Sequence, residues 1–138
     1  MTSSFPKGSR SYNMSRIKST DTRPEMLVRR YLFAQGLRYR LHDRRLPGKP
    51  DIVLPKYKTV IHIHGCFWHS HAGCVLNRLP KSKPEYWIPK LQGNANRDAE
   101  NSVRLKSLGW RTLTVWECEL KPKVIADTLA SLLRQINS

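Results

Sequence analysis

The sequence has few acidic side chains. It contains 10 Asp and Glu against 25 Lys and Arg in 138 residues, which gives a formal net charge of +15. The basic residues are spread along the whole chain, as Arg10, Arg44, Arg45, Lys121 and Lys123 illustrate, so we expect them to form a broad basic face on the folded surface. Such a face favours a nucleic acid over a small acidic substrate as the partner. A generally basic protein without a polyanionic partner is the alternative.

The sequence also lacks long apolar runs and has few cysteines. No stretch approaches the roughly 20 apolar residues that a membrane-spanning helix needs, and residues 1–6, MTSSFP, contain no signal-peptide core. Both observations predict an intracellular protein without a membrane partner. In a reducing compartment, we expect the three cysteines to bind a metal or to remain free thiols, because disulfides do not persist there.

The chain length and the order of the expected elements predict one α/β domain. Residues 1–11 are basic and rich in Ser, Pro and Gly, and we expect a flexible basic arm there, followed by a single domain at residues 12–138. Apolar spacing and breaker residues predict helices at 22–35, 85–88, 94–108 and 122–136, and strands at 37–42, 51–54, 59–64 and 110–116, the first strand with a basic outer face. This order is typical of a mixed central sheet flanked by helices.

The stretch TVIHIHGCFWHSHAGC, residues 59–74, joins a strand pattern to a dense group of metal-binding side chains. Its β-branched first half predicts a buried strand. Thiolates and imidazoles form the soft ligand set of zinc, which takes four of them in a structural site. We therefore predict a structural zinc ion bound by Cys66, His71, Cys74 and, beyond the end of a later strand, Cys118. Buried free thiols with solvated histidines are the alternative.

Side chains at two expected strand ends suggest a nuclease centre. Nucleases commonly need a hard cation held by carboxylates and backbone carbonyls. Asp51 begins one strand and Ile63-His64 ends the next, so they can meet at one edge of the sheet, with Glu25 supplied by the first helix. The alternative for Asp51 is a turn residue, because it directly follows a proline.

Two histidines and an aspartate add candidates for proton transfer. His64 and His69 can act as a general base or orient a phosphate, and Asp98 can fix the tautomer of one of them. Asp98 also lies early in an expected helix, where it favours the helix dipole. Glu25 has a competing structural role too, because Thr22 and Glu25 have the spacing of a capping box.

Large aromatic side chains are interleaved with basic residues in the middle of the chain. Phe67, Trp68 and Trp87 suit stacking on bases or insertion between them, and core packing is the alternative for each. Near the N-terminus, Met14 and Ile17 form an apolar pair on an expected helical turn. They are expected either to dock on the domain or to insert at a DNA groove.

Several motifs together resemble the very-short-patch-repair (Vsr-type) DNA mismatch endonucleases, over about residues 12–135. They are Asn13-Met14, Asp21-Thr22, LPGKPD at 46–51, HGCFWH at 64–69, Arg97-Asp98, LGWR at 108–111 and VWEC at 115–118. The resemblance implies a restriction-endonuclease-like α/β fold in the bacterial cytoplasm, associated with the nucleoid. It also implies magnesium-dependent nicking on the 5′ side of the thymine in T·G mismatches that arise by deamination of 5-methylcytosine. The implied partners are the mismatched duplex and mismatch-repair proteins, and the enzyme is expected to be a monomer.

The resemblance also implies roles for individual residues. Asp51 is the expected magnesium ligand, with Ile63 contributing its carbonyl. Glu25, His64, His69 and Asp98 are the expected acid, base and water-holding groups. Cys66, His71, Cys74 and Cys118 are the expected zinc ligands. Phe67, Trp68 and Trp87 are the expected aromatic wedge, with Met14 and Ile17 approaching from the other groove.

The sequence departs from the family pattern at two places near these residues. The loop from His71 to Cys74 is one residue longer than the family form, and His62-Ile63 replaces a Phe-Thr pair. Neither change removes an expected catalytic group. Two other functions stay open at this point: a restriction-type endonuclease that cuts matched duplex, and a zinc-stabilised DNA-binding module without activity.

Overall fold

The computed structural model describes residues 22–69, 71, 74 and 83–138. Within them the chain forms helices α2 (Arg23–Ala34), α3 (Pro84–Ser107) and α4 (Ile125–Asn137), strands β1 (Arg40–Leu41), β2 (Ile52–Leu54), β3 (Thr59–His64) and β4 (Arg111–Trp116), and two 3₁₀ turns, η1 (Pro55–Tyr57) and η2 (Glu117–Leu120). The expected N-terminal arm, and Met14 and Ile17, lie outside the described residues. No helix in the described part of the chain is both long enough and apolar enough to cross a membrane.

The strands form one mixed sheet in the order β1-β2-β3-β4. β2 pairs antiparallel with both β1 and β3, whereas β3 and β4 run parallel. Parallel neighbours require a crossover connection, and α3 supplies it between β3 and β4. The predicted mixed sheet flanked by helices is therefore confirmed, and the protein has an α/β architecture.

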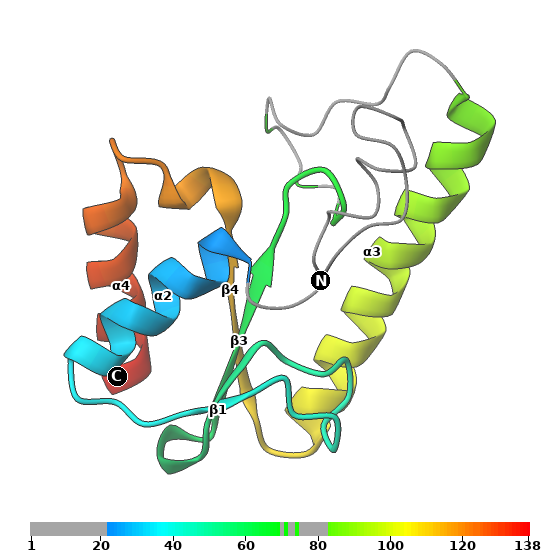
Figure 1. The fold of residues 1–138 in the computed structure, drawn as a ribbon. Helices are drawn as coiled ribbons and strands as arrows, with labels where there is room; N and C mark the ends of the chain where they lie inside the picture. The colour runs from blue at the N-terminus through cyan, green and yellow to red at the C-terminus, as the bar shows by residue number, and fades with distance from the viewer. Residues whose placement is uncertain (1–21, 70, 72–73, 75–82) are drawn as a thin grey trace, which may run out of the picture.

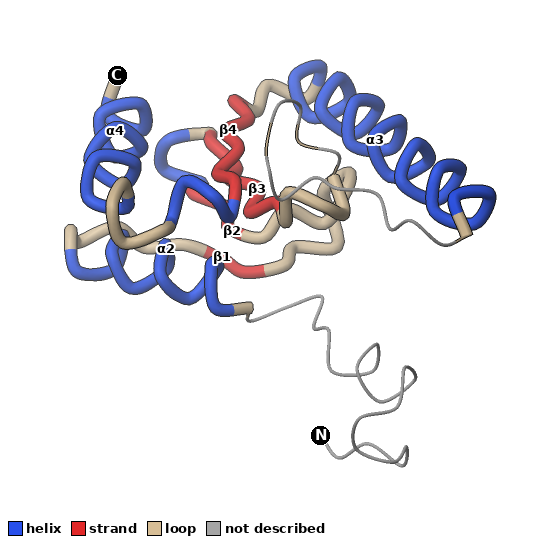
Figure 2. Tube along the Cα trace, turned by 90° about the horizontal axis from the view of Figure 1, so that it is seen from above, coloured by secondary structure: helices blue, strands red, loops and turns tan. Residues whose placement is uncertain are grey.

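Helices cover both faces of the sheet (Figures 1 and 2), with α2 and α4 on one face and α3 on the other. Successive side chains of a strand point to opposite faces of the sheet. The apolar side chains of the strands therefore contribute to two cores, one on each face. The larger core, under α2 and α4, joins Val28, Leu32, Leu129, Leu132 and Ile136 to Ile52, Leu54, Ile61 and Val115 from the strands. The smaller core, under α3, consists of Val53, Val60 and Leu105.

Helix α3 differs from the prediction, which broke it at Pro89. The structure has a single helix that passes through Pro89. Trp87 and Leu91 are both buried, and because they are four residues apart they lie on the same helix face. Their packing on both sides of the proline outweighs its local cost. Of the apolar residues near its C-terminal end, Leu105 is buried, whereas Val103 and Leu108 are exposed.

Strand β1, Arg40–Leu41, is shorter than the predicted strand at 37–42. The N–H of Leu37 donates to the carbonyl of Leu32, and Gly36 has a φ of +87°. This hydrogen bond closes the C-terminal end of α2 in the manner of a Schellman motif. Leu37 therefore completes the helix end and does not begin a strand.

Candidate active site and metal centre

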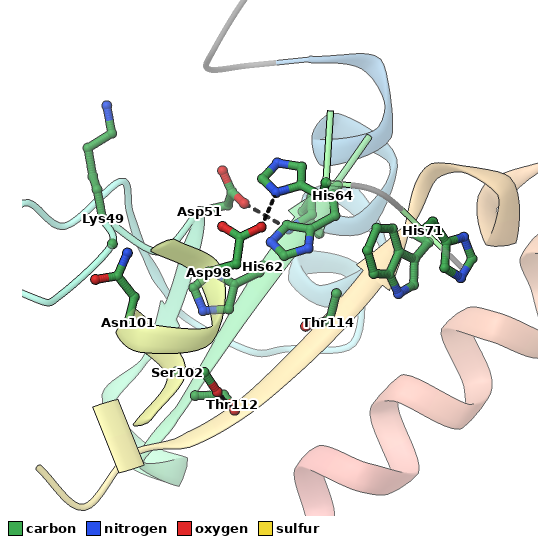
Figure 3. A pocket seen from close by; sticks show the side chains of 14 residues that line it. Lys49, Asp51, His62, His64, His71, Asp98, Asn101, Ser102, Thr112 and Thr114 are labelled. Carbon is green, nitrogen blue, oxygen red and sulfur yellow. Dashed lines mark hydrogen bonds and ion pairs between the residues drawn. The ribbon is translucent and has the colours of Figure 1, made fainter. Parts of the chain in front are cut away.

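The face of the sheet under α3 changes from apolar to polar along β3. Val60 packs under α3 at one end, and the alternation of the strand places His62 and His64 on the same face farther along. The polar end lines a cavity of about 680 Å³ between the sheet and α3. Figure 3 shows Asp51, His64 and Asp98 close together at one end of this cavity, and Ser102 and Thr112 at the other.

Asp51 lies immediately before β2 and points into this cavity. Its Oδ2 accepts a hydrogen bond of 2.7 Å from the backbone N–H of Ile63 on β3. Burial raises the pKa of Asp51 from 3.8 to about 6, although the Ile63 hydrogen bond opposes this shift, and the Glu25 carboxylate raises it further. A half-desolvated carboxylate of this kind is well suited to a cation, which would offset the cost of its burial.

Glu25 lies in the first turn of α2 and is only 1% exposed. The Thr22 hydroxyl accepts the N–H of Glu25 at 3.4 Å, so the predicted N-cap is confirmed. The Glu25 carboxylate contacts His42 Nε2 at 2.9 to 3.0 Å and an Arg29 guanidinium nitrogen at 3.2 Å. One side-chain oxygen each from Glu25 and Asp51 and a ring nitrogen of His42 lie within 4.8 Å of one another, which is close enough to hold a metal ion.

His42 is the residue of this site that sequence reasoning missed. The alternation of residues 37–42 predicts that His42 lies on an exposed basic face, but its side chain is 17% exposed and contacts Glu25. Its backbone has a φ of +47°, which departs from strand geometry directly after β1 and interrupts the alternation. The signal that could have identified His42 was the pairing of the two expected strands, because a hairpin of β1 and β2 brings His42 next to Asp51.

His64, His69 and Asp98 form a second group at the same cavity. The rings of His64 and His69 stack in parallel, with centroids 3.8 Å apart. His69 Nδ1 lies 2.5 Å from Asp98 Oδ2. Because an ionised carboxylate can only accept, Nδ1 carries the hydrogen and Nε2 of His69 is left to accept a proton. Asp51, His69 and Asp98 also line an adjoining cavity of about 760 Å³, together with Glu25.

The histidines of β3 stay neutral near pH 7. Burial, followed by the nearby charge of His69, lowers the pKa of His64 to about 3. Burial also lowers the pKa of His62. Nδ1 of His64 is buried and has no hydrogen-bond partner among the described residues. At Asp98, burial raises the pKa, but the hydrogen bond from His69 and the electrostatic effects of His69, His64 and His62 together outweigh it, and the net shift is downward.

The four predicted zinc ligands come together beside the sheet. One side-chain atom each from Cys66, His71, Cys74 and Cys118 lies within 4.8 Å of the others. Cys118 Sγ is 3.5 Å from His71 Nδ1. Three thiols and one imidazole match the ligand set of a closed tetrahedral metal site, so the group can bind a metal ion. Burial raises the pKa of the Cys66 thiol to about 12, and a bound cation would counter this effect.

Contacts around the cysteines connect the metal centre to β4. The backbone N–H of Cys66 donates to Glu117 Oε1 at 2.9 Å. The ring of His71 stacks on Trp116, with centroids 4.0 Å apart. Because Trp116 and Glu117 directly precede Cys118, three consecutive residues of the chain contact the loop after β3.

The three predicted wedge residues form one aromatic cluster. The ring centroids of Phe67, Trp68 and Trp87 are 5.1 to 5.8 Å apart, in edge-to-face pairs. Phe67 and Trp68 are partly exposed, whereas Trp87 is 7% exposed. Trp87 therefore supports the other two rings from the α3 side, and Lys90 places its ammonium group 6.0 Å from the Trp68 ring centre.

Comparison with known proteins shows that this chain is similar to one family of DNA endonucleases. A model of the family "DNA mismatch endonuclease Vsr" matches residues 2–75. The type II nicking enzyme V.NmeAIP of Neisseria meningitidis is 49% identical over 137 residues, which cover 99% of this chain and 97% of that protein. The DNA mismatch endonuclease Vsr of Escherichia coli is 45% identical over 115 residues, which cover 83% of this chain and 73% of that protein.

A further relative, the type II nicking enzyme V.XorIIP of Xanthomonas oryzae, is 47% identical over 120 residues, which cover 87% of this chain and 88% of that protein. The family model spans more than half of this chain, and the relatives cover most of it. These matches agree with the polar cavity and the cysteine and histidine group described above. The chain is an endonuclease that belongs to the DNA mismatch endonuclease Vsr family.

Proposed function

We propose that this protein is a magnesium-dependent, strand-specific nicking endonuclease that cuts on the 5′ side of the thymine in T·G mismatches arising from deamination of 5-methylcytosine. The observation that carries the proposal is the convergence of Glu25, Asp51, His69 and Asp98 on one cavity in a member of the Vsr family. Nicking is supported by the names of relatives that match nearly the whole chain. A net charge of +15 supports binding to the phosphate backbone.

The oxygen ligands at the sheet edge suit a magnesium ion. Asp51 and the Ile63 carbonyl would hold it, with Glu25 close enough to contribute. Hard oxygen ligands and a desolvated carboxylate are the chemistry that this cation requires. When bound, magnesium would stabilise negative charge on the phosphate and on the leaving oxygen.

The histidines would move the protons of the reaction. Asp98 holds His69 in the tautomer that leaves Nε2 free, so His69 can take a proton from the attacking water. The neutral His64, stacked on His69, would orient a phosphate oxygen through a hydrogen bond. The Glu25 carboxylate would hold water near the reacting phosphorus, because both His42 and Arg29 keep it in place.

Zinc at Cys66, His71, Cys74 and Cys118 would have a structural role. Four protein ligands leave no open position for water or substrate. Cys118 is distant in sequence from the other three, so the metal would link the loop after β3 to the end of β4. The loop also carries His69, Phe67 and Trp68, and the zinc site would therefore help to fix their positions.

The aromatic cluster would detect a mismatch by inserting between base pairs of the DNA duplex. Phe67 and Trp68 are the partly exposed rings and would enter the base stack, supported by Trp87. Met14 and Ile17 would approach from the other groove. We further propose a restriction-endonuclease-like fold, a monomeric enzyme associated with the nucleoid in the bacterial cytoplasm, and contacts with mismatch-repair proteins.

The proposal is tested by incubating the purified protein with T·G-containing and fully matched duplexes, with and without magnesium. We expect a single cut in the thymine strand of the T·G duplex, and only with magnesium. Equal cutting of matched duplex at a defined sequence would indicate a restriction-type endonuclease. Tight DNA binding without any cutting would indicate a DNA-binding module.

A further inference from the structure

We propose that His42 is a positioning residue that fixes both carboxylates of the site, Glu25 through its side chain and Asp51 through its backbone. The inference rests on the proposed function, because it treats these carboxylates as the ones that serve magnesium. Although the ring nitrogen of His42 lies within 4.8 Å of the carboxylate oxygens, we assign it no place among the magnesium ligands, because this cation takes oxygen ligands. Its role is to keep two acidic groups in a fixed arrangement.

The contacts of His42 reach both carboxylate residues. Its ring nitrogen Nε2 lies 3.0 Å from Oε1 and 2.9 Å from Oε2 of Glu25, so it bridges both carboxylate oxygens. Its backbone N–H donates to the carbonyl of Asp51 at 3.1 Å. A single residue therefore joins the first turn of α2 to the start of β2, although Glu25 and Asp51 are far apart in sequence.

His42 has an unusual backbone conformation, which directs its ring toward Glu25. Its φ of +47° lies in the left-handed region, which costs free energy for any residue with a Cβ. The residue directly follows β1, where a regular continuation would place the ring differently. The cost is offset by the two contacts, one to each carboxylate residue.

The arrangement matters because the two carboxylates are like charges in a buried place. Glu25 is 1% exposed, and its carboxylate is within metal-binding reach of that of Asp51. Two adjacent negative groups repel each other and move apart unless other groups hold them. Arg29 contacts Glu25 from within the same helix, whereas His42 contacts it from the strand side and is also bonded to Asp51. His42 is therefore the group that sets the distance between the two.

The test compares truncation with conservative replacement of the ring. Asparagine accepts a left-handed φ, and glycine accepts it without cost, so His42→Asn and His42→Gly should keep the backbone bond to Asp51 but lose the contact with Glu25. Glutamine reaches about as far as Nε2 of histidine and can donate the same hydrogen bond. The control is Lys58→Asn, which replaces another residue with a positive φ, +51°, at the far end of β3.

Two quantities are measured on the zinc-loaded full-length variants: Mn²⁺ binding, by the loss of the free-ion paramagnetic resonance signal, and the magnesium concentration that gives half-maximal nicking. We expect both truncations to weaken Mn²⁺ binding and to raise this magnesium concentration by about 10- to 100-fold, as when a group that orients a metal ligand is removed. His42→Gln should restore both quantities to near the parental values, and Lys58→Asn should change neither. The nicking rate at saturating magnesium should change less than the magnesium requirement.

Two results would overturn the role of His42. Parental metal binding in folded His42→Asn and His42→Gly would show that the contact is not needed, and equal impairment of His42→Gln and the truncations would show that its hydrogen bond is not the cause. If Asp51→Asn binds Mn²⁺ as the parent does, the proposed magnesium site itself is wrong. That last result is distinct from the other two, so the failure of the inference and the failure of the proposed function can be told apart.

Discussion

The carboxylate of Asp51 accepts a 2.7 Å hydrogen bond from the N–H of Ile63, which ties the start of β2 to the end of β3. This contact fixes a carboxylate in a half-buried position at the polar edge of the sheet. A charge held in such a position lowers the stability of the protein unless a cation is bound. The site should therefore reduce the stability of the fold, and the reduction should depend on pH.

The first prediction concerns this pH dependence. The pKa of Asp51 rises from 3.8 to about 6 on folding, so the folded protein binds the proton more tightly than the unfolded chain. The resulting stabilisation is present below about pH 4 and is lost as the pH rises through about 6. Asp51→Asn removes the charge and keeps an oxygen for the Ile63 N–H. We expect it to raise the free energy of unfolding at pH 7 by on the order of 1–3 kcal/mol.

Urea unfolding without divalent cations measures the effect at pH 4 and pH 7. The increase in the free energy of unfolding caused by Asp51→Asn should disappear near pH 4. The matched control is Asp43→Asn, because hydrogen bonds from Arg45 lower the pKa of Asp43 to about 2. Such a carboxylate contributes stability above its unfolded pKa, so its removal should give no gain at pH 7. A parent protein at least as stable as Asp51→Asn at pH 7 would contradict the account.

The second prediction concerns the contact between Gly48 and α3. Gly48 has a φ of +75°, and a Cβ at this position would lie 2.9 Å from Nδ2 and 3.0 Å from Cβ of Asn101. Asn101 is one turn beyond Asp98 on α3, and both line the cavity. Gly48→Ala should therefore displace the loop before Asp51 or shift α3. We expect the nicking rate to fall by roughly 10- to 100-fold, because small displacements of reacting groups are costly.

Gly36→Ala is the control for backbone strain. Gly36 has a φ of +87°, and a Cβ there would meet nothing within 4 Å. Both variants should lose about 1 kcal/mol of stability from the left-handed conformation, but only Gly48→Ala should lose activity. Equal nicking rates for the two variants would show that the close approach to Asn101 does not position the site.

The third prediction concerns the metal centre. Cys118 comes from the turn after β4, and its thiol meets ligands from the loop after β3. Cys118→Ala should bind less zinc and melt at a lower temperature, since metal binding is coupled to closure of the loop. Treatment of the parent with a chelator should lower its melting temperature toward that of the variant. Elemental analysis that finds equal zinc in the two proteins would contradict the ligand assignment.

The fourth prediction concerns the partly exposed rings of the aromatic cluster. A T·G wobble should open more easily than a matched pair, so an inserted wedge gains selectivity from deformability. Phe67→Ala with Trp68→Ala should weaken binding to T·G duplex more than binding to matched duplex, and should reduce the ratio of the two affinities by about tenfold. Zinc content must be shown to be intact, because Cys66 is adjacent.

Arg45→Ala is the comparison for charge alone. The Arg45 guanidinium is exposed and pairs with Asp43, and a contact from it to phosphate carries no information about the base pair. This variant should weaken binding to both duplexes about equally. If the double aromatic variant behaves in the same way, these rings are packing residues and the mismatch is recognised elsewhere.

Much of the fold could be predicted from local patterns. The apolar spacing of Leu129, Leu132 and Ile136 identified the buried face of α4, and the β-branched residues 59–61 identified a central strand. The metal-binding group was also readable, because three of its members lie close together in sequence and their chemistry is distinctive. In each case the signal comes from residues near one another in the chain.

The features that were missed depend on contacts between distant segments. The continuity of α3 through Pro89 requires the burial of both Trp87 and Leu91, which local propensity does not report. The inward position of His42 depends on its left-handed backbone and on Glu25, seventeen positions earlier in the chain. Glu25 was expected near Asp51, but its spacing also fits a capping residue, and only the three-dimensional arrangement shows the contact of its carboxylate with His42.

The most direct test of the central claim is single-turnover nicking of a T·G duplex by the parent and by Asp51→Asn, with the cut mapped on both strands. The account predicts that the parent, with magnesium, cuts only the thymine strand on the 5′ side of the mismatched base. It predicts that Asp51→Asn binds the duplex with nearly parental affinity, since one carboxylate contributes little beside a net charge of +15, but forms no product in the time that the parent needs for completion. A variant that nicks at a near-parental rate would contradict the account.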